Sequence, residues 1–76
     1  MEIDFIVLIK AGVGPVLVRY ADIIVMETTP VGCTRLDFGY GDSMIVEENI
    51  LCVIEKIKAA KLLNEIEIVS PANNTK

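Results

Sequence analysis

The chain has 76 residues, 53% of them hydrophobic, and its seven basic and eleven acidic side chains give a formal net charge of −4. This length allows one domain, and such a chain buries only about 60% of the surface that its unfolded form exposes. The acidic balance disfavours nucleic-acid binding, because lysine and arginine contacts to phosphate supply most of that affinity. No apolar run in the sequence approaches the ~18 residues of a membrane-spanning helix.

Two cysteines and no histidine limit covalent and metal stabilisation. Cys33 and Cys52 allow one disulfide. However, the first residues carry the acids Glu2 and Asp4 and no basic residue, unlike a secretion signal, so we favour two free thiols in a reducing cytosol. A structural zinc site takes about four cysteine or histidine ligands, more than the chain supplies. We therefore expect a cytoplasmic protein with no metal or cofactor, stabilised by partner chains.

The first half of the chain predicts short strands separated by turns about every ten residues. Residues 3–9 are almost entirely apolar, which predicts a strand covered on both faces or central in its sheet. Glycines and a proline in residues 11–15 mark a turn, so residues 16–20 form a hairpin with the first strand. Residues 23–28 predict a third strand, rich in β-branched side chains.

The next stretch predicts a second hairpin. Residues 34–38 alternate, with threonine, leucine and phenylalanine on one face and arginine and aspartate on the other, as in a half-buried strand. The glycine-rich residues 39–42 predict a turn, and residues 43–46 predict a fifth strand.

The spacing of the apolar residues then changes to that of a helix. Ile50, Val53, Ile54 and Ile57 follow the i, i+3, i+4, i+7 pattern of an amphipathic helix, predicted over residues 47–64. Acidic residues in its first turn and lysines towards its end suit the helix dipole.

The last residues are expected to close the domain. Residues 65–69 alternate between apolar and acidic side chains, which allows a sixth strand at a sheet edge. Pro71 ends this segment, so we predict one domain over residues 1–70 and a disordered tail over residues 71–76. The expected fold class is α+β: an antiparallel five- to six-stranded β-meander, either open or barrel-like, with one C-terminal amphipathic helix.

No residue pattern predicts catalysis. The Gly12-x-Gly14 pair leads into a proline and a strand, whereas a phosphate-binding loop opens into a helix. Cys52 has no histidine to activate it as a nucleophile. The carboxylate pairs Glu47–Glu48 and Asp37–Asp42 could serve acid–base chemistry only beside a substrate cleft, and acids are ordinary at a helix start or a hairpin end. We expect no enzyme, and an active site shared between subunits ranks last among the alternatives.

Four basic and aromatic residues outside the helix are candidate ligand- or partner-binding residues: Arg19, Tyr20, Arg35 and Tyr40. Arginine and tyrosine are favoured at interfaces, and arginine binds anions through several donors. If the sheet gathers them on one surface, they form a binding site. The alternative is that they are solvated strand positions, with Arg35 paired to an acid across a strand.

Three stretches in the middle of the chain contain residues typical of turns and of the start of a helix. They are Met26–Pro30 (METTP), Thr34–Asp42 (TRLDFGYGD) and Ile45–Glu48 (IVEE). Over residues 23–60 this pattern resembles the small flagellar-operon family FlbD, also called SwrD, and similar small phage and bacterial proteins. Residues 8–12 depart from the Thr-Arg-Leu-Asn-Gly hairpin of that family. The resemblance implies the same architecture and a non-catalytic accessory protein that acts through protein contacts.

The leading hypothesis is therefore a non-catalytic protein-interaction or accessory module, flagellar-accessory-like by resemblance, that forms a homo-oligomer. It rests on the excess of apolar residues, because apolar surface that a small domain cannot bury alone tends to be covered by another chain. The alternative is a small phage-type protein that captures an anionic signalling nucleotide or inhibits a host factor, with the four candidate residues gathered in an oligomer.

Overall fold

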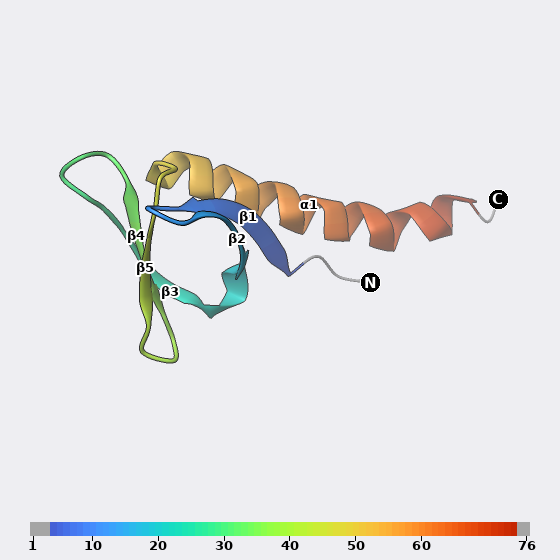
Figure 1. Cartoon of the computed structure of the whole chain (residues 1–76). Helices are drawn as coiled ribbons and strands as arrows, with labels where there is room; N and C mark the ends of the chain where they lie inside the picture. The colour runs from blue at the N-terminus through green and yellow to red at the C-terminus, as the bar shows by residue number, and fades with distance from the viewer. Residues whose placement is uncertain (1–3, 75–76) are drawn as a thin grey trace.

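The computed structural model describes residues 4–74, with side chains described up to Asn64. Five strands precede one long helix (Figure 1). In chain order the elements are β1 (Phe5–Lys10), β2 (Gly14–Arg19), the 3-10 helix η1 (Tyr20–Asp22), β3 (Ile23–Thr28), β4 (Thr34–Phe38), β5 (Ser43–Val46) and α1 (Ile50–Asn74). The α+β class, with an antiparallel five-stranded sheet and one C-terminal helix, is confirmed.

The sheet is open, with strand order β2-β1-β5-β4-β3. The β1–β2 hairpin pairs from Phe5 opposite Arg19 to Lys10 opposite Gly14. The strands β3, β4 and β5 form an antiparallel meander. Hairpin and meander join where Lys10 lies opposite Val46. Because β2 and β3 remain as edges, the sheet does not close into the barrel that the sequence allowed.

The two edge strands are connected by only the three residues of η1. In a flat five-stranded sheet the edges lie roughly 19 Å apart, because neighbouring strands are separated by ~4.8 Å. A 3-10 segment rises only about 2 Å per residue. The sheet must therefore curl, and Figure 1 shows the β1–β2 hairpin turned across the meander.

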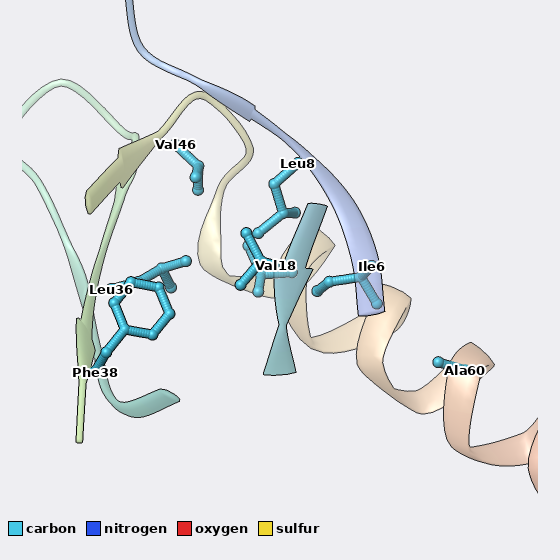
Figure 2. Packing of buried hydrophobic residues seen from close by; sticks show 8 residues of the cluster. Ile6, Leu8, Val18, Leu36, Phe38, Val46 and Ala60 are labelled. Carbon is cyan, nitrogen blue, oxygen red and sulfur yellow. The ribbon is translucent and has the colours of Figure 1, made fainter. Parts of the chain in front are cut away.

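The core fills the inside of this curl. Figure 2 shows side chains of the meander pointing toward side chains of the hairpin, with α1 below them. The buried hydrophobic residues are Ile6, Leu8, Val18, Leu36, Phe38, Val46, Val53 and Ala60. Each fully buried aliphatic or aromatic side chain contributes about 1.5–3 kcal/mol to folding. The alternation predicted for residues 34–38 holds, since Thr34, Leu36 and Phe38 are buried.

The helix begins at Ile50, three residues later than predicted, after Asn49 as its N-cap. The Asn49 side-chain oxygen accepts the backbone N–H of Cys52 at 2.8 Å. The helix then runs on to Asn74, through residues 65–69 and past Pro71. The sixth strand allowed for residues 65–69 is thus replaced by helix, as is the start of the predicted tail; residues 75–76 lie outside the described residues. Figure 1 shows this helix continuing beyond the sheet, in a molecule that measures 52 × 23 × 20 Å.

Side chains take the place of a strand along one edge of β1. The Glu48 carboxylate accepts the Ile9 N–H at 3.0 and 3.1 Å, and the Lys56 ammonium donates to the Val7 carbonyl at 2.7 Å. Lys56 and Glu48 also pair at 3.3 Å. The Thr34 hydroxyl donates to the Glu48 carbonyl at 2.8 Å, which ties the same residue to β4. Glu48 therefore connects hairpin, meander and helix.

Candidate functional site

Arg35 lies on the outer face of β4, between the buried Thr34 and Leu36. Its guanidinium contacts the carboxylate of Asp37 at 3.3 Å and that of Glu27, opposite it on β3, at 3.9 Å. This is the cross-strand pairing that the sequence offered as the alternative to a binding role. Arg35 is therefore paired with two acids of the sheet and remains half-exposed.

The other three candidate residues lie on different elements. Tyr40 is in the β4–β5 turn, 65% exposed, with its ring stacked on Phe38 at a centroid distance of 5.4 Å. Arg19 is exposed on β2, which β1 and β5 separate from the strand of Arg35. Tyr20 belongs to η1 and is half-buried against the core. Arg19 and Arg35 thus lie on separate strands of one copy, and the described geometry gives them no common pocket.

Tyr20 does reach a cavity, one that the sequence analysis missed. A cavity of about 450 Å³ lies between η1, β3 and α1. It is lined by Tyr20, Ala21, Ile23, Met26, Ile54, Ile57, Lys58 and Lys61. We name it the β3–α1 pocket. It exists because the curl of the sheet brings β3 opposite the helix. Its one signal in the sequence is the pair of lysines, which suit the helix dipole equally well.

A second feature is an apolar surface on the outside of the hairpin. Phe5, Val7 and Leu17 are 50%, 49% and 69% exposed, and the register places Val7 opposite Leu17. A shallow groove of about 320 Å³ separates β1 from α1, where the exposed side chains of Ala59 and Leu63 continue the apolar surface. We call these five residues the apolar face.

The surroundings of Glu48 change the acidity of its carboxyl group. Burial of its carboxyl acts to raise the pKa, but the Ile9 N–H, its own backbone N–H and the Lys56 ammonium outweigh burial, and the pKa of Glu48 lies below its ordinary value. A carboxylate held in this way is an anchor rather than a proton donor. Its role is to position the hairpin against the helix.

The remaining features to consider among the described residues are the thiols, possible metal ligands and the length of the helices. Cys33 and Cys52 are free and half-buried. Among the described residues, no group of three cysteines or carboxylates is placed to hold a metal ion. Of the helical segments described, none has the length and hydrophobicity to cross a membrane. No protein-family model, curated protein or solved structure matches this chain.

Proposed function

We propose that this chain is a non-catalytic interaction module that self-associates through its apolar face. The observation that carries the proposal is the exposure of Phe5, Val7 and Leu17 on adjacent strands, continued by Leu63 on the helix. Their exposed area is on the order of 400 Å², as large as the largest apolar patch of a typical soluble monomer. The resemblance to the FlbD family, with its accessory role through protein contacts, agrees with this proposal.

A second copy suits this face in area. Two copies in face-to-face contact bury about twice the patch, and the polar rim around it brings the total towards the ~1,200 Å² at which specific interfaces begin. The face is also uneven, because the exposed Leu17 lies on β2 and the groove lies on the other side of β1, between β1 and α1. In a two-fold contact each copy presents the same projection and the same groove, so the surface can be complementary to itself.

The charges on the face support the same occupant. In a two-fold contact, residues near the axis meet their own counterparts, so a charge there would be repelled. Val7 and Leu17, in the middle of the hairpin, are apolar, and the charged Arg19 lies at the strand end opposite Phe5. Lys56 also lines the groove, but its ammonium donates to the Val7 carbonyl and pairs with Glu48 within its own copy.

Pro15 favours contact through the face over pairing through the edge of β2. The Ile9 N–H and C=O point away from β2, toward the Glu48 carboxylate and the Glu47 N–H. Pro15, opposite Ile9, must then point its own backbone outward, at the free edge. Proline has no N–H to offer a second strand there, and such a proline blunts an edge against strand addition.

The test is molar mass by light scattering coupled to size exclusion over a dilution series. We expect the wild type to form a dimer that dissociates on dilution, and Leu17→Lys to be monomeric throughout. Val31→Lys is the matched control, because Val31 is 84% exposed in the β3–β4 turn, away from the apolar face. A wild type that is monomeric at every concentration, or a Leu17→Lys variant with the wild-type mass, refutes the proposal.

A further inference from the structure

The β3–α1 pocket has the size and wall of a small-molecule site. Its volume of about 450 Å³ falls within the roughly 300–1,000 Å³ of ligand pockets, which are mostly apolar with few polar groups. Ile23 and Met26 from β3 face Ile54 and Ile57 from α1, and all four are only half-buried in the structure. The flexible Met26 side chain can adjust to a ligand of varied shape. This wall suits an alkyl chain.

The polar groups of the pocket are of one charge. Lys58 and Lys61, three residues apart on the same side of α1, both line it, and no carboxylate belongs to its described lining. Neither lysine forms an ion pair with a described residue, whereas Lys56 is engaged by Glu48. The chain as a whole has a net charge of −4, whereas the described lining of this pocket carries two positive charges and no negative one.

We propose that the β3–α1 pocket binds a medium-chain alkyl carboxylate, with the chain between β3 and α1 and the carboxylate at Lys58 and Lys61. A carboxylate between two ammonium groups accepts charge-assisted hydrogen bonds, which are about twice as strong as neutral ones. The long lysine stems can cover the alkyl chain while their charged ends stay in water. Neither the apolar face nor self-association is needed for this site.

The experiment is a titration of the full chain with decanoate, below its micelle concentration, followed by amide chemical shifts and by the melting temperature. We expect shifts centred on residues of the pocket and a higher melting temperature, because a ligand of the native state stabilises it. Octanoate, with two fewer methylenes, should bind on the order of tenfold more weakly, since each buried methylene tightens binding roughly fourfold. Decyltrimethylammonium, with the same chain and the opposite charge, should not bind.

Two sets of variants separate charge from shape. Lys58→Gln with Lys61→Gln should weaken decanoate binding at least about tenfold, while arginine at both positions should preserve it and the control Lys10→Gln should bind like the wild type. Ala21→Phe fills the pocket from an exposed position of η1 and should abolish binding. Equal binding of decyltrimethylammonium, an unchanged affinity in the double glutamine variant, or no response of the wild type overturns the proposal. The Leu17→Lys variant should bind decanoate normally, so the two proposals fail independently.

Discussion

Replacing Glu48 by alanine should destabilise the protein more than any other change to an acidic side chain in the described part of the chain. Its side chain is only 11% exposed, and its carboxylate accepts the Ile9 N–H and pairs with Lys56. Alanine leaves the Ile9 N–H without its acceptor, which costs about 1–3 kcal/mol, and deprives Lys56 of its partner. We expect a loss of about 2–3 kcal/mol in the free energy of unfolding for Glu48→Ala, and about 1 kcal/mol for Glu48→Gln, whose amide oxygen still accepts the Ile9 N–H.

This loss is large for a small domain, whose total stability is roughly 0.05–0.15 kcal/mol per residue. In a domain of this size each kcal/mol lowers the melting temperature by about 4–8 °C, so far-ultraviolet circular dichroism during heating and in urea resolves the series. The control is Glu47→Ala, because the Glu47 side chain is exposed and only its backbone N–H bonds to Ile9. If Glu48→Ala and Glu47→Ala agree within about 0.5 kcal/mol, Glu48 does not anchor the hairpin as described.

Two further predictions concern acidity and the turns. The pKa of Glu48 is lower in the folded than in the unfolded chain, so the unfolded state binds more protons at acidic pH; stability from Glu48 should be present above the ordinary pKa of 4.5 and be lost as pH falls through the folded value. Urea titrations across this range should show a fall that Glu48→Gln lacks, and equal slopes for both proteins would contradict the assignment. Gly41→Ala should cost about 1 kcal/mol or more, because Gly41 has φ +97° in the β4–β5 turn, where an L-residue is strained. Gly39→Ala, which places its Cβ at an ordinary 3.8 Å from Ile24, is the control, and equal costs would refute the role of the backbone conformation.

The strands could largely be predicted from the sequence, because the residue patterns that favour a strand lie within the strand itself and in the turns beside it. Predicted segments 23–28, 34–38 and 43–46 coincide with β3, β4 and β5, where β-branched or alternating residues lie between glycine turns. The helix was less predictable at both ends. Its start moves to Ile50 because the Glu47 backbone and the Glu48 side chain bond to Ile9 instead. Its end moves to Asn74, because a helix that has already formed gains about one hydrogen bond for each residue that it adds.

The candidate binding residues were less predictable, because their placement depends on non-local contacts. Residue type alone marks the arginines and tyrosines as candidates, but Arg35 lies among acids of β3 and β4, whereas Tyr20 lies in η1 and packs against the core. The curl depends on the pairing of β1 with β5, and no local sequence pattern predicts that pairing. Lys58 and Lys61 have a sequence context typical of any helix end, and only the position of β3 makes them part of a pocket.

The junction at Glu48 also bears on the order in which the chain folds. The β1–β2 hairpin and the β3–β5 meander pair residues that are close in sequence, and hairpins of this kind form in about 1–10 μs. Joining Lys10 to Val46 closes a much longer loop, whose entropy must be lost before the contact is gained. The two units are therefore expected to form first and to dock last, with the Glu48 bonds absent from the transition state. Glu48→Ala should then accelerate unfolding while leaving the refolding rate nearly unchanged in stopped-flow measurements, and slowed refolding would mean that the docked junction is the nucleus.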